Sequence, residues 1–200
     1  MARLSVGERR ELLFAAAIRV LEREGLAALS TRAIVSEAGM SLASFHYAYA
    51  SHEELLVEII ASVVRGEREA GFTAVIDAGH TTPRAAIHGA LSAYLDLVRS
   101  DPGREQAMFE LTQHALRTPA LWHLAGEQYA RYRAVATELL DLLAQAFGAT
   151  WDCPTEELAR FVISMTDGLT LSWLADRDET ASERLITLAT DALMSHLEDS

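Results

Sequence analysis

Apolar residues recur along most of the chain at spacings of three and four, and no sustained alternation of apolar and polar residues occurs. A spacing of three and four places apolar side chains on one face of an α-helix, whereas alternation is typical of strands. We therefore predict an all-α protein with almost no strand. The predicted helices cover residues 5–24, 30–38, 42–48, 51–77, 83–100, 102–116, 119–147, 154–176 and 180–198.

The predicted helix starts carry residues that favour such positions. A hydroxyl residue followed three positions later by Glu can form a capping box, in which both side chains satisfy free backbone amides. Proline is best tolerated at the first helical position. The predicted capping boxes are Ser5 with Glu8, Ser51 with Glu54, and Thr180 with Glu183, and the prolines at predicted helix starts are Pro83, Pro102, Pro119 and Pro154.

The first three predicted helices form one unit, residues 1–50, and the six longer helices form a second, residues 51–200. Gly39 can adopt a positive φ and turn the chain between a helix capped by Ser30 and one capped by Ser41. Two short helices joined by such a turn and backed by a third are the layout of a helix-turn-helix. The backing helix carries its predicted buried face at Leu13, Phe14, Ala17, Ile18 and Leu21, and Gly25 follows it as a stop.

The third helix would then enter the major groove of DNA. Phe45 and Tyr49, spaced i, i+4, are predicted to point into the core. The predicted DNA-facing residues on the opposite side are Leu42, Ala43, Ser44, His46 and Tyr47, and the predicted phosphate contacts are Ser30, Thr31, Arg32 and Ser41. This helix has no Arg, Lys, Asn or Gln to read bases by paired hydrogen bonds. From these residues alone, an ordinary end of a helical bundle is an equal alternative.

The net charge of −12 argues against a polyanion as partner until its distribution is considered. Residues 1–50 hold six Arg and five Glu, whereas residues 51–200 hold the other 11 basic and 24 acidic residues. Any DNA contact is therefore expected in the N-terminal quarter, where Arg3, Arg9 and Arg10 could form a basic arm.

Other features of the sequence exclude several classes of function. No apolar run reaches the length of a spanning helix, and the N-terminus is charged, so we expect a cytoplasmic protein without membrane contact. Cys153 is the single cysteine and has no nearby His in the sequence, so we expect no disulfide, no metal site and no cysteine nucleophile. No phosphate loop or nucleophile elbow is present, and we expect neither a cofactor nor enzyme activity.

The stretch from Gly25 to Leu55 resembles the DNA-binding signature of the tetracycline-repressor (TetR) family. The matching elements are a glycine, a hydroxyl residue capping the second helix, an apolar pair, Glu-Ala-Gly, an apolar residue with Ser, an aromatic-rich recognition helix and a Leu. Three positions depart from the pattern: Ala43 replaces a glycine, His46 a tyrosine and His52 a phosphate-binding lysine. The resemblance implies a DNA-binding role, with His52 as a further phosphate contact that is weaker or pH-dependent.

The second unit diverges from any such pattern, and its candidate effector residues rest on helical position and chemistry. Aromatic and polar side chains on buried helix faces can line a pocket, although core packing is the default for each one singly. The candidates are Tyr94, Met108, Phe109, Gln113, His114, Trp122, Tyr129, Tyr132, Phe161, Met165, Asp167 and Trp173. Asp167 would favour a cation and the aromatic residues a ring.

The last two helices are predicted to form a dimer interface. Their apolar stripes are Phe161, Val162, Met165, Leu169 and Trp173 on one helix and Leu185, Leu188, Ala192 and Leu193 on the next, with Gly168 allowing close approach. The family resemblance implies a four-helix bundle between two copies and a palindromic operator.

The function expected from these features is that of a ligand-responsive DNA-binding regulator, a repressor that a small-molecule effector releases from a palindromic operator. Effector binding would tilt the helix that begins near His52 and so change the spacing of the two recognition helices. The alternatives are a helical ligand-binding protein with weak or lost DNA binding and an enzyme working in the helical pocket.

Overall fold

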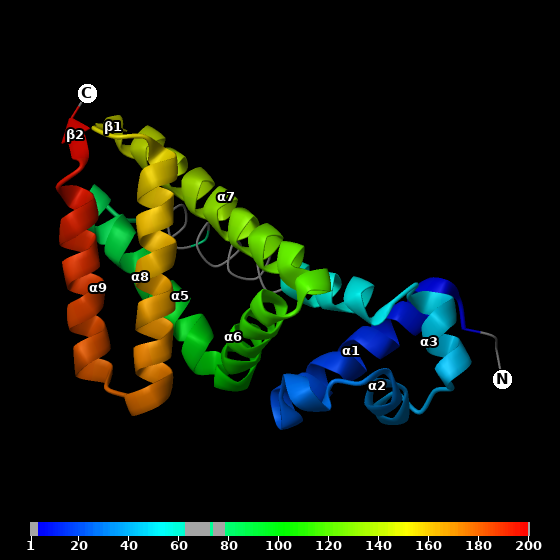
Figure 1. Cartoon of the computed structure of the whole chain (residues 1–200). Coiled ribbons are helices and arrows are strands. Elements are labelled where there is room, and N and C mark those ends of the chain that lie inside the picture. The colour runs from blue at the N-terminus through cyan, green and yellow to red at the C-terminus, as the bar shows by residue number, and fades with distance from the viewer. Residues whose placement is uncertain (1–3, 63–72, 74–78, 200) are drawn as a thin grey trace. The chain divides into compact units, whose positions relative to one another are not determined.

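The computed structural model describes residues 4–62, 73 and 79–199. It is almost entirely helical, as the apolar spacing predicts (Figure 1). The helices are α1 (Val6–Glu24), α2 (Thr31–Glu37), α3 (Leu42–Ala48), α5 (Pro83–Ser100), α6 (Pro102–Arg117), α7 (Trp122–Phe147), α8 (Thr155–Asp176) and α9 (Glu179–Met194), with 3₁₀ turns at Leu26–Ala28 and Pro119–Leu121. Residues 52–62 are also helical, and the rest of the predicted helix 51–77 lies largely outside the described residues.

The chain divides into two compact units. The first comprises Met1–Val63 and Asp101–Glu127, and the second comprises Val64–Ser100 and Gln128–Ser200. The first unit therefore joins the predicted helix-turn-helix with α6, which lies far along the sequence. The predicted boundary between a DNA-binding domain, residues 1–50, and an effector-binding domain, residues 51–200, stays a prediction.

In the first unit, α1 packs against α2, α3 and α6. Its buried face consists of Leu13, Ala16, Ala17, Val20 and Leu21, whereas Phe14 and Ile18 are only half-buried. The prediction for this face was therefore wrong at two positions. The helix has neighbours on more than one side, so the face that they cover is shifted around the helix from the predicted one.

A hydrogen bond and a close backbone approach fix α6 against the end of α1. The Glu110 carboxylate accepts a 2.8 Å hydrogen bond from the backbone N–H of Leu26. Gly103 lies so close to α1 that a Cβ there would stand 3.1 Å from the carbonyl oxygen of Glu22. Because a larger side chain would push the helices apart, glycine at this position permits the close packing.

The second unit packs α5, α8 and α9 with the greater part of α7 around one apolar core. Its most deeply buried residues are Ala86, Leu95, Val98, Ala159, Leu169 and Ile186. Two short strands, β1 (Ala149–Trp151) and β2 (Leu197–Asp199), pair antiparallel at the ends of α7 and α9. The prediction that the last helix reaches residue 198 was therefore wrong. A strand of three residues is too short to show a recognisable alternation of apolar and polar positions in the sequence.

Most predicted helix starts agree with the structure, and the exceptions have local causes. Ser5 and Glu8 form both bonds of the capping box, at 3.2 and 2.7 Å. Ser51 accepts from the N–H of Glu54, but the Glu54 carboxylate accepts from Ala50 instead of completing the box. Asp178, not Thr180, caps α9, because the chain leaves α8 through Arg177 at φ 55° and places the Asp178 carboxylate 2.9 Å from the N–H of Ala181.

Two prolines also differ from the prediction. Pro119 opens a 3₁₀ turn, and Pro154 occupies the capping position of α8 instead of its first helical position. Among the residues that the structure describes, no helix has the length and apolar character needed to cross a membrane.

Candidate functional site

The predicted recognition helix is held by two aromatic side chains. Phe45 and Tyr49 are buried, with ring centroids 5.4 Å apart. The guanidinium of Arg10 lies 4.3 Å from the centroid of the Tyr49 ring and binds the carboxylates of Glu54 and Glu58. These contacts tie α3 to α1 and to the helix that begins after Ser51, so the orientation of α3 is fixed within the unit.

The turn between α2 and α3 has the geometry that Gly39 predicts. Gly39 adopts φ 63°, and the N–H of Met40 donates to the carbonyl of Val35 at 2.8 Å. The hydroxyls of Ser30 and Ser41 each accept a 3.2 Å hydrogen bond from an amide of the helix they cap. Both helix starts therefore form as predicted.

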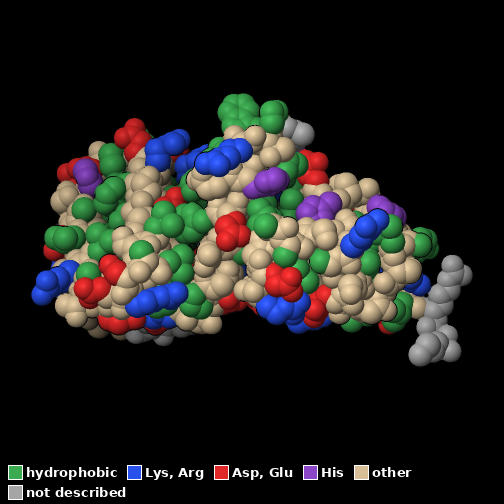
Figure 2. Space-filling view, turned by 60° about the horizontal axis from the view of Figure 1, so that its bottom comes forward, with side chains coloured by type: hydrophobic (Ala, Val, Ile, Leu, Met, Phe, Trp, Pro, Cys, Tyr) green, Lys and Arg blue, Asp and Glu red, His purple; other side chains and the backbone are tan. Residues whose placement is uncertain are grey.

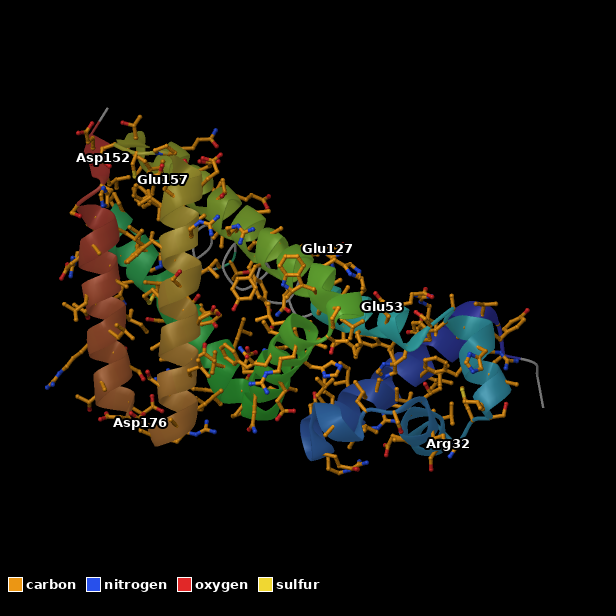
Figure 3. The ribbon with its side chains drawn as sticks, viewed as in Figure 1. Arg32, Glu53, Glu127, Asp152, Glu157 and Asp176 are labelled. Carbon is orange, nitrogen blue, oxygen red and sulfur yellow. The ribbon has the colours of Figure 1, made fainter. Side chains whose placement is uncertain are left out.

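The outer face of α3 exposes most of the residues predicted to meet DNA. Leu42, Ala43, His46 and Tyr47 are exposed, and Tyr47 is 61% exposed. Ser44 differs from the prediction because it is half-buried and its hydroxyl lies within 3.3 Å of an Arg9 nitrogen and 3.0 Å of the Ser41 hydroxyl. On α2, Arg32 is exposed (Figure 3) and Thr31 is half-buried.

The arginines of the first unit differ in their availability to a phosphate. Arg10, Arg19 and Arg23 each form ion pairs with glutamates. Arg9 instead donates to the carbonyl of Leu4 and to Ser44, and its guanidinium lies 5.6 Å from the ring centroid of Tyr47. Within residues 4–62, Arg9 and Arg32 are arginines without a carboxylate partner. The expected basic arm therefore reduces to Arg9, since Arg10 is engaged and Arg3 lies outside the described residues.

His52 stands where the family pattern has a lysine, but its ring faces inward. Burial lowers the pKa of His52 below its usual value, and the nearby His114 lowers it further, while a hydrogen bond to the backbone of Leu29 acts in the opposite direction. Its Nε2 is buried and has no hydrogen-bond partner among the described residues. A neutral ring in this position is a poor phosphate ligand, so the predicted contact of His52 with DNA finds no support in this placement.

The residues predicted to bind an effector divide between the two units. Those in the first unit are Met108, which is buried, Phe109, which is half-buried, and Gln113, His114 and Trp122, which are exposed. Trp122 is 66% exposed, so it faces away from the core of its unit. The second unit holds Tyr94, Tyr129, Tyr132, Phe161, Met165, Asp167 and Trp173.

Tyr129 and Asp167 form a polar pair within the second unit. The phenol of Tyr129, on α7, donates a 2.7 Å hydrogen bond to Oδ2 of Asp167, on α8. Burial raises the pKa of Asp167, and the hydrogen bond from Tyr129 lowers it by a smaller amount. Among the described residues no cation contacts this carboxylate, and the partner that donates to it is a neutral phenol.

Further polar side chains surround this pair. Tyr94 and Thr170 share a 2.7 Å hydrogen bond between their hydroxyls. The Tyr132 ring packs edge-on against Tyr129, with centroids 5.8 Å apart, and its hydroxyl accepts from buried Gln128 at 3.1 Å. Gln128 and Thr170 were missing from the prediction. A buried polar residue on an otherwise apolar helix face was the signal that could have identified both.

Trp173 has a structural role at the turn from α8 to α9. Its indole N–H donates to Glu179 at 3.0 Å, and the guanidinium of Arg177 lies 3.9 Å from its ring centroid. Trp173 is also buried in the core of the unit. Its contacts explain its position without an effector.

The predicted dimer stripes are only partly exposed. Leu169, Trp173 and Leu193 are buried within the second unit and cannot meet another copy. Hydrophobic side chains nevertheless lie among charged ones on the surface of this unit (Figure 2). The large ones on α8 and α9 are Phe161, Leu171 and Leu188, and Gly168 is exposed on the same helix as the first two.

Comparisons with known proteins agree with this arrangement. Residues 13–59 match the family model described as bacterial regulatory proteins of the tetR family, and residues 83–198 match that of the C-terminal domain of BetI-type transcriptional repressors. The chain is 30% identical to the nicotine-responsive transcriptional repressor HdnoR of Paenarthrobacter nicotinovorans, over 98% of each chain. It is 28% identical to the transcriptional regulator BetI of Rhizobium meliloti, over 94% of this chain and 89% of that one.

A solved structure of a TetR-family regulator from Rhodococcus sp. has the same fold. It aligns with a TM-score of 0.77 at 17% identity, over 94% of this chain and 99% of that one. These relatives are regulators that carry a helix-turn-helix, so they do not favour the alternative of a ligand-binding protein without DNA binding. The chain belongs to the TetR family of bacterial DNA-binding transcriptional regulators and carries a BetI-type C-terminal domain.

Proposed function

We propose that this regulator is a repressor that reads DNA through the outer face of α3 and leaves its operator when an effector binds. The observation that carries the proposal is the exposed Tyr47 beside Arg9, on a helix whose opposite side is fixed by buried Phe45 and Tyr49. An aromatic side chain with a hydroxyl and a guanidinium without a carboxylate partner together suit a groove lined by phosphates.

Base reading would then rest on apolar and hydroxyl contacts. Leu42 and Ala43 can meet thymine methyls, and Tyr47 can donate to a base edge or a phosphate. Arg32 and the capping residues Ser30, Thr31 and Ser41 would contact the backbone of the DNA. Because few charges are involved, we expect a shallow dependence of affinity on salt.

Two copies would bind a palindromic operator as a homodimer. The exposed Phe161, Leu171 and Leu188 supply apolar surface for association through α8 and α9. A two-fold dimer presents two recognition helices, which matches the symmetry of a palindrome.

The effector that the second unit suits is a basic amine that carries an aromatic ring. Asp167 is a half-buried carboxylate with Tyr129 as its partner and no cation nearby in the described residues. A protonated amine would balance that charge, and the rings of Tyr129 and Tyr132 offer aromatic surface. The relative that is 30% identical is named as responsive to nicotine, which is an amine with an aromatic ring.

The remaining features of the proposal follow from this role. The protein acts in the cytoplasm, where the bacterial chromosome lies, and it works by binding, without catalysis or a cofactor. Along the linear chain, residues 1–50 form the DNA-binding domain, and residues 51–200 bind the effector and form the dimer.

Binding to DNA from the region upstream of the protein's own gene tests the regulator proposal. The full-length protein should bind selectively, and Tyr47→Ala should weaken binding by about tenfold or more. Trp122→Ala is the matched control, because it truncates an exposed aromatic residue outside α3 and should leave the affinity unchanged. Equal losses in both variants would contradict the assignment of α3 as the reading surface.

Release of the bound operator by nicotine and by simpler basic amines that carry an aromatic ring tests the effector class. Asp167→Asn keeps an acceptor for Tyr129 but removes the charge, so it should abolish release while leaving operator binding intact. Release that is equally strong in this variant would contradict a role for the carboxylate in recognising the amine.

A further inference from the structure

The β1–β2 end of the second unit brings together three potential metal ligands. Asp152, Cys153 and His196 offer a carboxylate oxygen, a thiol sulfur and a ring nitrogen that all lie within 4.8 Å of one another. Figure 3 places Asp152 at one end of α8 and Asp176 at the other. This group takes no part in the DNA-binding face or in the Tyr129–Asp167 pair.

The backbone holds the two segments that carry these ligands in register. β1 pairs with β2 through Trp151 and Leu197, and the N–H of Asp152 donates to the carbonyl of His196 at 3.0 Å, which extends the ladder by one residue. Asp152 and His196 therefore stand opposite each other, and their side chains meet at 2.8 Å between Oδ1 and Nδ1.

Anchors on both sides of this ladder limit its movement. The indole N–H of Trp151 donates to the carbonyl of Leu140 at 3.1 Å, and Pro154 caps α8 directly after Cys153. Cys153, Trp151 and Leu197 also pack against the apolar core of the unit. The ligands thus project from a supported corner instead of a free terminus, and such support is what a metal site requires.

We propose that Asp152, Cys153 and His196 bind a zinc ion that clamps the C-terminal strand to the start of α8. Thiolate, imidazole and carboxylate together are the ligands of Zn²⁺, whereas Mg²⁺ and Ca²⁺ take oxygen ligands. Bonds of about 2.0–2.3 Å to a tetrahedral ion require ligand atoms about 3.5 Å apart. The Asp152 and His196 ligand atoms, 2.8 Å apart, would therefore separate slightly to admit the ion, and all three ligand atoms already lie within 4.8 Å of one another.

Zinc binding to this set releases one proton to the solvent. The S–H bond of Cys153 breaks as the S–Zn bond forms, and the proton passes to the buffer. His196 gives up its hydrogen bond to Asp152 and binds the metal through Nδ1, with the ring proton on Nε2, and Asp152 supplies negative charge. Three protein ligands leave the fourth position to water, which fits the exposure of Asp152 and His196 at 39% and 46% of their side chains.

The arrangement does not suit a cysteine nucleophile. A nucleophilic triad needs the imidazole between the thiol and the carboxylate, so that it can take the thiol proton. Here Asp152 is the group that lies within hydrogen-bonding reach of both Cys153 and His196. The carboxylate occupies the central position, so metal ligation is the chemistry that this geometry favours.

Zinc titration of the full-length, chelator-stripped protein tests the site without DNA or effector, so its result is independent of the proposed regulation. With a chromogenic zinc indicator as competitor, one Zn²⁺ should bind per protomer. Cys153→Ser, His196→Gln and Asp152→Asn should each weaken affinity by about tenfold or more. His123→Gln, which removes an exposed histidine of the first unit, is the control and should change nothing.

Cobalt supplies a second readout that a nonspecific surface contact would not give. Co²⁺ bound to the protein should show a thiolate-to-metal absorption band in the near ultraviolet, and Cys153→Ser should lose it. Retained helical circular dichroism in each variant shows that folding is intact. No zinc binding, a zinc affinity that is equal in all four variants, or a missing thiolate band would each overturn the proposal.

Discussion

The Tyr129 hydroxyl donates a 2.7 Å hydrogen bond to the Asp167 carboxylate, and this joins α7 to α8 by a contact between an acid and a phenol. Burial raises the pKa of Asp167, because the charged form loses hydration and gains only one neutral partner among the described residues. A bound cation would therefore stabilise the charged form of this carboxylate.

Asp167→Asn should not destabilise the ligand-free protein at neutral pH. A carboxyl whose pKa is raised on folding binds its proton more tightly in the folded state, so its contribution to stability falls as pH rises above the ordinary value of 3.8. The variant should melt at the same temperature as the parent or a few degrees higher at pH 7, and the difference should shrink toward pH 4. Circular dichroism melts across this range measure it, and a large fall in Tm at pH 7 would contradict it.

Replacing Phe45 should lower the stability of the first unit much more than replacing Tyr47. Phe45 is fully buried, so Phe45→Ala should cost about 3–5 kcal/mol in the free energy of unfolding. Tyr47→Ala removes an exposed side chain and should change stability by less than about 0.5 kcal/mol while still weakening DNA binding. Urea denaturation distinguishes the two, and similar losses would show that Tyr47 is part of the core.

The pH dependence of stability should carry a contribution from His52. A histidine whose pKa is lowered on folding stabilises the folded state above its ordinary pKa of 6.5, and that stability is lost as pH falls below 6.5. His52→Gln should therefore reduce the loss of stability below pH 6.5, as measured by urea denaturation at several pH values. Between pH 7 and 8 the protonation of His52 should not change, so it should not make operator affinity depend on pH in that range. A steep dependence of operator affinity on pH that disappears in His52→Gln would contradict a neutral ring.

Two glycine substitutions should have opposite effects. Gly25 has φ 76°, and a Cβ there would stand 2.9 Å from Oε2 of Glu110, so Gly25→Ala should destabilise the protein by about 1–2 kcal/mol. Gly126 lies within α7, and a Cβ there would meet none of the described residues within 4 Å, so Gly126→Ala should stabilise the protein by about 0.5–1 kcal/mol. Thermal melts compare them, and a destabilising Gly126→Ala would reveal an unrecognised contact.

A charge at Leu188 should separate the proposed dimer. Leu188 is 65% exposed on α9, so Leu188→Glu should leave the fold intact but weaken association by about 2 kcal/mol or more. Leu12→Glu, at an exposed position on α1, is the matched control. Sedimentation analysis reports the oligomeric state, and a dimer that tolerates Leu188→Glu would move the interface elsewhere.

Local chemistry made most of the fold predictable from the sequence. Hydroxyl caps, prolines and glycines act within a few residues, so the limits of α1, α2 and α3 follow from Ser5, Ser30, Gly39 and Ser41. Where two local signals compete, as Asp178 and Thr180 do, the backbone leaving the preceding helix decides which side chain reaches the amide.

The candidate sites were less predictable, because they depend on contacts between distant segments. The outer face of α3 could be predicted from the spacing of apolar residues, because buried Phe45 fixes which side of the helix faces the core. The ion pairs that engage Arg10 and the inward turn of His52 depend on neighbours from other elements. His196 lies 44 residues after Asp152, so only the pairing of β1 with β2 brings a histidine to Cys153 and overturns the expectation that none is near.

The bond from Leu26 to Glu110 has a consequence for protein engineering. A chimeric regulator made by exchanging residues 1–50 between relatives would replace α1 but keep the α6 that was fitted to it. Glu110 would then face the backbone of a foreign segment, and the close approach at Gly103 would meet an unmatched helix. Grafts of DNA specificity onto this scaffold should therefore transfer residues 101–127 together with the N-terminal segment, because the transplantable module is discontinuous in the chain.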